Sequence, residues 1–182
     1  MKHLIWLTIL SLAALSLATP MPTRAQTPPA NPVSTSMREV LDSYSTNLVA
    51  AAEEMPADKY SYHPTPAQMT FGKSMEHVAE VNNFACSKVS GTPAPQGPKA
   101  TEKDPKDKLV AGLKVSMAFC KQAFSKLSDA SLGESVTWFG GGKVTRFEAA
   151  LEVTNDLIDH YAALAVYLRL NGLLPPTAQT KQ

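Results

Sequence analysis

A long amphipathic segment near the C-terminus, with helix signals at both of its ends, most strongly constrains the fold of this chain. Thr145 and Glu148 form a Thr-x-x-Glu capping box, which predicts a helix from Arg146 to Leu170. The helix should end soon afterwards, because Gly172 suits a left-handed C-terminal cap and two prolines follow it. Such a helix would be about 37 Å long at ~1.5 Å per residue. Its predicted core face comprises Phe147, Leu151, Thr154, Ile158, Tyr161, Ala165 and Leu168.

Three further segments with helical periodicity precede this one. Each begins at a residue type that caps helix N-termini and ends where Gly, Pro or short polar residues interrupt the apolar spacing. They run from a cap at Ser34, Thr35 or Ser36 to about Met55, from a cap at Thr70 to about Val89, and from Asp104-Pro105 to near Ser128-Asp129. Four long helices without a convincing strand predict an all-α protein, a four-helix bundle.

An irregular crossover is expected before the last helix. The segment SVTWFGGGK, residues 135–143, places three glycines directly after Trp138 and Phe139, and this pattern indicates a tight crossover or a small hairpin. A Gly-Gly-Gly-Lys run can also suggest phosphate binding. Here it lacks both the spacing of a Walker motif and a preceding strand–helix unit, so a phosphate site is not predicted.

The first 25 residues have the pattern of an export signal. Lys2 precedes an apolar run at 4–18, and Thr23-Arg24-Ala25 supplies small residues before a cleavage site at Gln26. The run is short for a membrane span, so a cleaved peptide is favoured over a retained anchor. The predicted organisation is a signal peptide at 1–25, a Pro-rich linker at 26–33, a helical domain at 34–176 and a disordered tail at 177–182. The expected location is secreted or periplasmic, without membrane association after cleavage.

The chain carries almost no net charge once the signal is removed. The sequence has 17 Lys and Arg and 16 Asp and Glu, and Lys2 and Arg24 lie within the signal. The mature net charge is therefore about −1, with no Lys/Arg cluster and no basic stripe interleaved with aromatic residues. We do not expect nucleic acid as a partner.

The predicted export affects whether the two cysteines, Cys86 and Cys120, are expected to be paired or reduced. In an oxidising compartment they can pair, whereas in the cytosol they would stay reduced. Both lie on apolar helical faces that should meet in a bundle, which favours a disulfide between the second and third helices. The alternative is two separate buried thiols, which behave as small apolar residues.

Asp156 and His160 are candidates for chemistry, because side chains four residues apart on a helix project from one face. A carboxylate and an imidazole so placed can share a metal ion, form a hydrogen bond or be solvated separately. The plainest alternative is a helix-surface pair that stabilises the helix by ~0.2–0.5 kcal/mol. A lone histidine such as His77, on the second predicted helix, is more often structural than functional.

Two segments of the chain resemble exported members of the DinB-like superfamily. Residues 51–82, AAEEMPADKYSYHPTPAQMTFGKSMEHVAEVN, resemble the connection between the first and second helices of that family, together with the start of the second. Residues 160–176, HYAALAVYLRLNGLLPP, resemble its C-terminal motif. The resemblance spans most of the mature domain and implies a DinB-like four-helix bundle, with a homodimer as the family's habit. It says less about activity, because one fold hosts many functions.

The resemblance also implies a metal site. In this family one histidine from the second helix and two histidines four residues apart on the last helix bind the metal. His77 matches the first ligand and His160 the last, whereas Asp156 stands where the family has its middle histidine. A carboxylate oxygen also binds Zn²⁺, and two histidines with one carboxylate form many Fe(II) sites. We therefore expect His77, Asp156 and His160 to bind a divalent metal, Zn²⁺, Ni²⁺ or Fe²⁺, with open positions for water.

Two functions of different classes agree with these features. The first is an exported metal-dependent hydrolase or thiol-dependent transferase that acts on an unidentified small molecule. The transferase is disfavoured, because the related transferases use cytosolic thiols that export would put out of reach. The second is a non-catalytic module of the cell envelope, which uses the same bundle to bind a ligand or another protein. Metal analysis of the purified protein separates the two classes.

Overall fold

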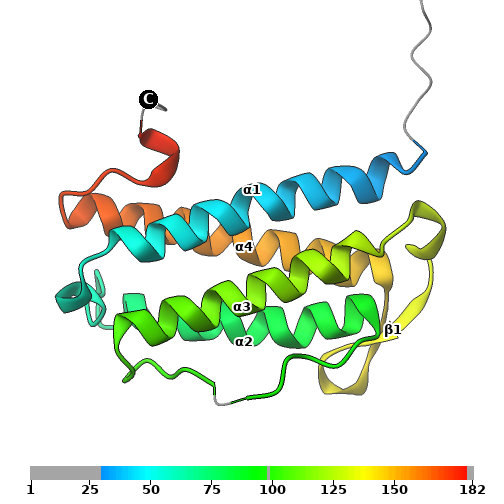
Figure 1. The fold of residues 1–182 in the computed structure, drawn as a ribbon, viewed down its shortest axis with the longest axis horizontal. Helices are drawn as coiled ribbons and strands as arrows, with labels where there is room; N and C mark the ends of the chain where they lie inside the picture. Colours follow the sequence, from blue (N-terminus) through cyan, green and yellow to red (C-terminus); the bar gives the residue numbers. More distant parts are fainter. Residues whose placement is uncertain (1–29, 98, 180–182) are drawn as a thin grey trace, which may run out of the picture.

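The computed structural model describes residues 30–97 and 99–179, and these form a four-helix bundle (Figure 1). The long helices are α1 (Pro32–Glu54), α2 (Phe71–Ser90), α3 (Lys106–Ser125) and α4 (Arg146–Leu170). Helix α2 packs against α3 and α4, and α1 packs against α4 and α3, so the four helices enclose one core. The predicted all-α bundle is confirmed. Among the described residues, none of the helices is long and apolar enough to cross a membrane.

Helix α1 begins earlier than predicted, at Pro32, so the last two residues of the predicted linker at 26–33 are helical. Ser34, Thr35 and Ser36 do not cap it. The Asp129 carboxylate, far away in the sequence, accepts hydrogen bonds from the backbone N–H groups of Val33 (3.2 Å) and Ser34 (2.8 Å). Proline is favoured at the first helical position because its φ suits the helix and its missing N–H would be unsatisfied there. A cap supplied by tertiary contact thus replaces the predicted local one.

Helix α2 follows its sequence signals closely, whereas α3 ends at Ser125, before the predicted end near Ser128-Asp129. The Thr70 hydroxyl accepts a hydrogen bond from the backbone N–H of Lys73 (3.0 Å), as an N-cap should, and Gly91 adopts the left-handed conformation (φ 69°) that ends α2. Helix α3 starts at Lys106 with Pro105 at the cap position, one residue later than predicted. Asp104 instead accepts a hydrogen bond from the backbone N–H of Thr101 (2.8 Å) and folds the connector that precedes α3.

The predicted crossover is a small antiparallel hairpin. Strands β1 (Ser135–Thr137) and β2 (Lys143–Thr145) pair with Val136 opposite Val144, and the short 3₁₀ turn Phe139–Gly141 joins them. Gly140 (φ 65°) and Gly141 (φ 82°) adopt backbone angles that other residues rarely reach, which explains the glycine run. The hairpin leads directly into α4, whose capping box is present as predicted: Glu148 accepts a hydrogen bond from the Thr145 backbone (2.6 Å), and Thr145 Oγ1 accepts one from the Glu148 backbone (3.1 Å).

The C-terminal end of α4 is closed by Gly172 (φ 75°), as the sequence predicted. The Leu173 N–H donates to the carbonyl of Leu168 (3.0 Å), which is the hydrogen bond of a Schellman motif. The start of the predicted disordered tail (177–182) is ordered, because Thr177 exchanges two hydrogen bonds with the Tyr161 hydroxyl (2.8 and 3.0 Å). The chain is thus held to the bundle beyond Pro176. The predicted signal at 1–25 and the last three residues lie outside the described residues.

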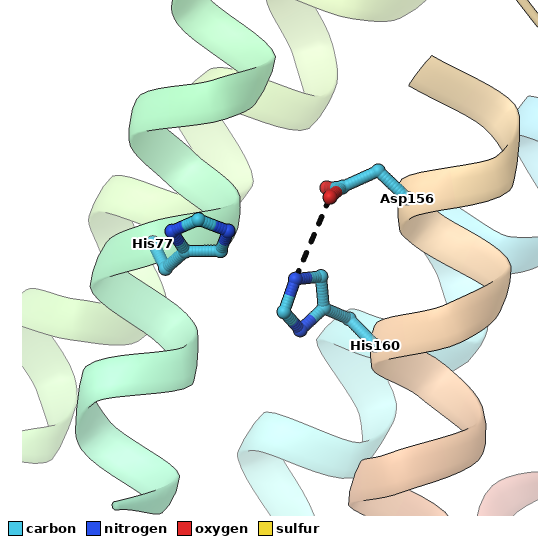
Figure 2. Close-up of side chains that lie close together, drawn as sticks. All are labelled: His77, Asp156 and His160. Atoms are coloured by element: carbon cyan, nitrogen blue, oxygen red, sulfur yellow. Dashed lines mark ion pairs between the residues drawn. The ribbon is translucent and has the colours of Figure 1, made fainter. Parts of the chain in front are cut away.

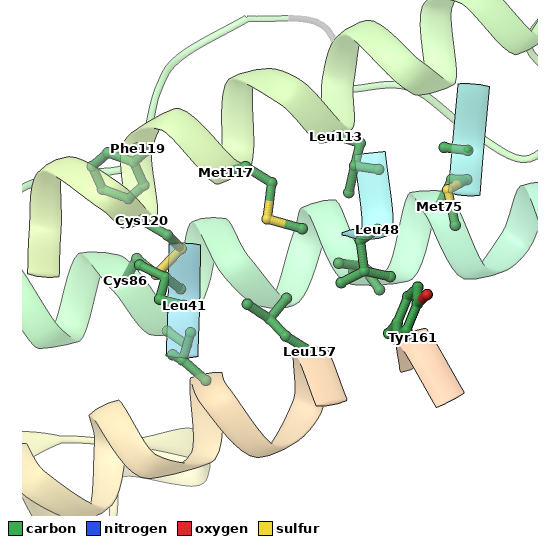
Figure 3. Close-up of a cluster of buried hydrophobic side chains, with 14 of the residues drawn as sticks. Leu41, Leu48, Met75, Cys86, Leu113, Met117, Phe119, Cys120, Leu157 and Tyr161 are labelled. Atoms are coloured by element: carbon green, nitrogen blue, oxygen red, sulfur yellow. A yellow bond between two sulfur atoms is a disulfide. The ribbon is translucent and has the colours of Figure 1, made fainter. Parts of the chain in front are cut away.

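The core is mainly apolar, and a disulfide crosses it (Figure 3). Cys86 on α2 and Cys120 on α3 are joined, with their Cα atoms 5.2 Å apart and neither residue exposed. This separation lies within the range that a disulfide spans without backbone movement. The bridge fastens the two helices at a position where large apolar side chains already meet, including Leu41, Met117 and Leu157.

The predicted core face of α4 is partly wrong. Phe147 (38% exposed), Leu151 (38%) and Ile158 (37%) lie at the surface, whereas the other predicted members are buried. The stripe that fills the core has the three- and four-residue spacing of Ala150, Val153, Leu157, Tyr161, Leu164 and Leu168. Helix α4 is apolar around much of its circumference, so sequence spacing alone does not select which stripe faces α1 and α2.

Candidate metal centre

The antiparallel packing of α2 and α4 positions the site. At one end of the pair, the Arg146 guanidinium donates to the carbonyl of Val89, so the start of α4 lies beside the end of α2. At the other end, the Tyr167 hydroxyl donates to the carbonyl of Met69 (3.0 Å), just before α2 begins. His77, within α2, therefore lies level with the middle of α4, which is where Asp156 and His160 occur.

His77, Asp156 and His160 converge between these two helices (Figure 2). One candidate ligand atom from each residue lies within 4.8 Å of the other two. His160 Nε2 lies 3.5 Å from Asp156 Oδ1, and the two imidazole rings have centroids 4.9 Å apart with an angle of 56° between their planes. Asp156 and His160 come from successive turns of α4, and His77 points at them from α2. The structure therefore brings together all three residues that the resemblance singled out.

The donor set fits a divalent cation. The Asp156 Oδ2 atom is buried and has no hydrogen-bond partner among the described residues, and an unsatisfied buried acceptor costs roughly 1–3 kcal/mol. Ligands around a tetrahedral Zn²⁺ at about 2.1 Å lie roughly 3.4 Å from one another. The 3.5 Å distance between Asp156 Oδ1 and His160 Nε2 already matches this value, and a candidate ligand atom of His77 lies within 4.8 Å of both residues. Nitrogen and oxygen donors together suit Zn²⁺, Ni²⁺ and Fe²⁺.

The site is half-buried, with side-chain exposures of 15% for His160 and 24% for Asp156. An ion there would be shielded from bulk water on the core side and would remain open to small molecules from outside. Three protein ligands leave at least one coordination position free, which is the arrangement of catalytic rather than structural zinc sites.

Other histidine, acidic, tyrosine and arginine side chains of this part of the chain have different roles. His63 is exposed and hydrogen-bonded to the carbonyl of Thr65 (2.7 Å) in the loop before α2. Glu80, one turn after His77, forms an ion pair with Lys99 (3.3 Å) and is largely exposed. Tyr167 has the packing role described above, and Arg169 donates to the carbonyl of Ala165 (3.3 Å) near the end of α4.

The sequence did not predict an aromatic cluster that lies along α2 from the site. The Phe139 ring from the hairpin stacks on Phe84 (centroids 4.1 Å apart, 24° between the planes), and Trp138 lies edge-on to Phe139 (5.1 Å). Phe84 follows His77 by seven residues, about 10.5 Å along the helix on nearly the same side. The aromatic pair directly before the three glycines was the available signal, but only the hairpin fold shows where it packs.

Comparison with known proteins shows which family and which solved structures this chain is similar to. Residues 41–164, more than half of the chain, match the family model of the DinB superfamily. A solved DinB-like protein from Bacillus subtilis is similar in structure (TM-score 0.64, 20% identity), covering 80% of this chain and 99% of that one. A DinB-like protein from Bacillus cereus gives a TM-score of 0.62 at 16% identity over 78% and 95% of the two chains.

A third solved structure, a mutant of the mycothiol-dependent maleylpyruvate isomerase, is similar over 72% of this chain and 60% of that one (TM-score 0.59, 15% identity). No curated protein sequence matches the chain. At these identities the structural neighbours show a shared fold and do not carry an activity across.

Proposed function

The chain belongs to the DinB superfamily, and we propose that it is an exported metal-dependent hydrolase whose ion is held by His77, Asp156 and His160. The observation that carries the proposal is the Asp156 carboxylate. One of its oxygens is buried and has no hydrogen-bond partner within residues 30–97 and 99–179, and it lies beside two imidazoles that come from different helices. A helix-surface pair of Asp156 and His160 alone would not require His77 to meet them.

The protein's own contribution is to hold these ligands on rigid elements. His77 is carried by α2 and the other two residues by α4, and both helices pack into the core next to the disulfide. A divalent ion bound there would supply Lewis acidity and would activate water at neutral pH. The partial exposure of the ligands lets a small substrate reach the site from solvent. These features favour hydrolysis of a small ester, amide or phosphoester.

A thiol-dependent reaction is the weaker alternative. The printed name of one structural neighbour identifies it as a mycothiol-dependent isomerase, but that neighbour shares only the fold with this chain. Such a reaction needs a low-molecular-weight thiol at the site, and the proposed export takes the protein away from the cytosol. We therefore favour water as the co-substrate.

The export part of the proposal rests on the signal pattern of residues 1–25. The buried disulfide supports it, because disulfides persist in oxidising compartments and are rare in the cytosol. The chain recovered from the cell envelope or medium should begin at Gln26 when its mass is measured. A full-length chain found only in the cytosol would reject export and would leave the metal site untouched.

Metal titration of the purified, chelator-treated protein tests the site. We expect binding of about one Zn²⁺, Ni²⁺ or Fe²⁺ per chain, with the melting temperature raised by metal and lowered again by chelator. At a free metal concentration of 100 Kd the stabilisation would be about 2.7 kcal/mol. His160→Ala should abolish binding, and Asp156→His should preserve or strengthen it. His63→Ala is the matched control, because it removes an exposed histidine outside the site.

The chemistry requires a second readout. Metal-loaded protein should hydrolyse at least one member of a panel of small carboxylic esters, amides and phosphoesters, and His160→Ala should lose that activity. The site would be rejected if the purified protein contained no stoichiometric metal and if chelator left its melting temperature unchanged. Binding without any hydrolysis across the panel would instead favour the non-catalytic envelope module.

A further inference from the structure

Tyr167 joins α4 to the start of α2, two helical turns from the candidate ligand His160. The tyrosine is buried, and its hydroxyl donates a hydrogen bond to the carbonyl of Met69 (3.0 Å). Seven residues separate Tyr167 from His160, which places them about 10.5 Å apart along the helix on nearly the same side. Tyr167 therefore faces α2, the same neighbour that His160 faces.

The Met69 carbonyl is linked to His77 by capped helix. Thr70 follows Met69 directly, and its hydroxyl accepts a hydrogen bond from the Lys73 backbone N–H (3.0 Å). The Thr70 carbonyl accepts a hydrogen bond from the Ser74 backbone N–H (3.0 Å), which closes the first turn of α2. His77 lies on the next turn. A contact that fixes Met69 against α4 thus also fixes how far along α4 the His77 side chain lies.

The ring of Tyr167 and its hydroxyl contribute in different ways. Tyr62 from the loop before α2 meets the ring edge-on (centroids 6.0 Å apart, 89° between the planes), and Phe71 at the start of α2 lies 6.5 Å away. Burial of apolar rings is non-directional, so these contacts hold the helices together without defining their register. The hydrogen bond is directional and is lost within a few tenths of an ångström beyond about 3.2 Å. The hydroxyl is therefore the part of the side chain that specifies register.

The other hydrogen-bonded link between these helices lies farther from the ligands. The Arg146 guanidinium donates to the carbonyl of Val89 at the opposite end of the pair. Val89 is twelve residues from His77, whereas Met69 is eight residues from it. Within residues 30–97 and 99–179, these are the two places where a side-chain hydrogen bond joins α4 to α2 or to the residues just before it. Loss of the Tyr167 link would leave only the distant one.

We propose that Tyr167 is a positioning residue for the metal centre, because its hydrogen bond to Met69 sets the register of α2 against α4. It acts through His77, the ligand that α2 points toward the pair on α4 (Figure 2). The candidate ligand atoms lie within 4.8 Å of one another, and one helical turn rises about 5.4 Å. A slip of part of a turn would therefore separate His77 from the other two. This inference rests on the proposed metal site.

The expected size of the effect follows from the strength of one hydrogen bond. A net contribution of this kind favours the bonded register over others by about three- to tenfold. The apparent Kd for a metal rises in proportion as the binding-competent register becomes less populated. Loss of the hydroxyl should therefore raise the Kd by about three- to tenfold. Loss of overall stability by itself leaves the Kd unchanged, as long as the protein remains folded.

Titration of the chelator-treated protein with Co²⁺, followed by the visible absorption of the bound ion, tests this role. Tyr167→Phe keeps the ring and removes the hydroxyl, so it should fold normally and bind Co²⁺ about three- to tenfold more weakly. Tyr161→Phe is the matched control on the same helix. Tyr161 follows His160 directly, but its ring meets Tyr44 on α1 (centroids 5.9 Å apart) and its hydroxyl bonds with Thr177. This variant should lose stability and bind Co²⁺ like the wild type.

A second background separates register from other effects of the substitution. His77→Ala leaves Asp156 and His160 as ligands, and both lie on α4. The register of α2 no longer matters to such a two-ligand site. Tyr167→Phe should therefore leave the Kd for Co²⁺ unchanged in the His77→Ala background, although it weakens binding when His77 is present.

The positioning role is overturned if Tyr167→Phe binds Co²⁺ as tightly as the wild type does. It is equally overturned if Tyr161→Phe weakens binding by the same factor, or if the effect of Tyr167→Phe persists in the His77→Ala background. A wild type that binds no Co²⁺ would reject the proposed metal site, and this role with it. A wild type that binds Co²⁺ no better than Tyr167→Phe would reject the role alone and leave the metal site standing.

Discussion

Replacing both Cys86 and Cys120 with alanine should destabilise the protein strongly, and the structure sets the size of the effect. The bridge spans 34 residues of sequence. On the chain-entropy model, closing a loop of that size lowers the entropy of the unfolded chain by about 12.6 cal/mol/K, which is about 3.8 kcal/mol at 25 °C. Both residues are fully buried, so loss of the sulfur atoms adds a smaller packing cost to the double variant.

Urea denaturation of oxidised wild type, reduced wild type and the double alanine variant measures this stabilisation. Reduced wild type keeps both sulfur atoms, so it separates the effect of the cross-link from the effect of packing. We expect reduction to lower the free energy of unfolding by about 3–4 kcal/mol. A domain of this size should then melt roughly 8–15 °C lower.

The entropic account fails if reduced wild type and the double variant both lie within about 1 kcal/mol of the oxidised protein, far below the loop-closure estimate. If the double variant alone were strongly destabilised, packing of the sulfur atoms would carry the effect. Mass measurement before and after thiol labelling of the unfolded protein confirms the redox state of each sample.

Two other predictions test the assignment of helix faces and helix caps. Leu157→Ala should lower the free energy of unfolding by about 2–5 kcal/mol, because Leu157 is fully buried. Leu151→Ala on the same helix should lower it by about 0.5 kcal/mol or less, because Leu151 lies at the surface. Equal losses in urea denaturation would contradict the observed orientation of α4. The hydrogen bond from the Ser34 backbone is the main cause that holds the pKa of Asp129 below its usual range. Because this folded-state pKa is lowered, the carboxylate stabilises the fold above its unfolded-state pKa of about 3.9, and the stabilisation is lost as pH falls through the folded-state pKa. Asp129→Asn should therefore melt below wild type at pH 7, and the difference should shrink in acid; a difference that is independent of pH would show that the charge is unimportant.

The sequence by itself determined where the helices lie, because the signals that start and stop them act over a few residues. The Thr145–Glu148 capping box and Gly172 limit α4 to the predicted residues, and Thr70 and Gly91 do the same for α2. Each signal satisfies backbone groups that an isolated helix end would leave unpaired, so it needs no knowledge of the rest of the fold. The four-residue spacing of Asp156 and His160 is equally local.

Only the tertiary structure decided which groups meet across the bundle. The apolar surface of α4 is wide enough for two orientations, and contact with α1 and α2 selects the one that exposes Phe147 and Ile158. The cap that Asp129 supplies to α1 joins residues 95 apart in sequence. The approach of His77 to the pair on α4 depends on the register of two antiparallel helices. Helix ends are set by neighbours in sequence, whereas these contacts are set by packing, which sums small energies from many residues at once.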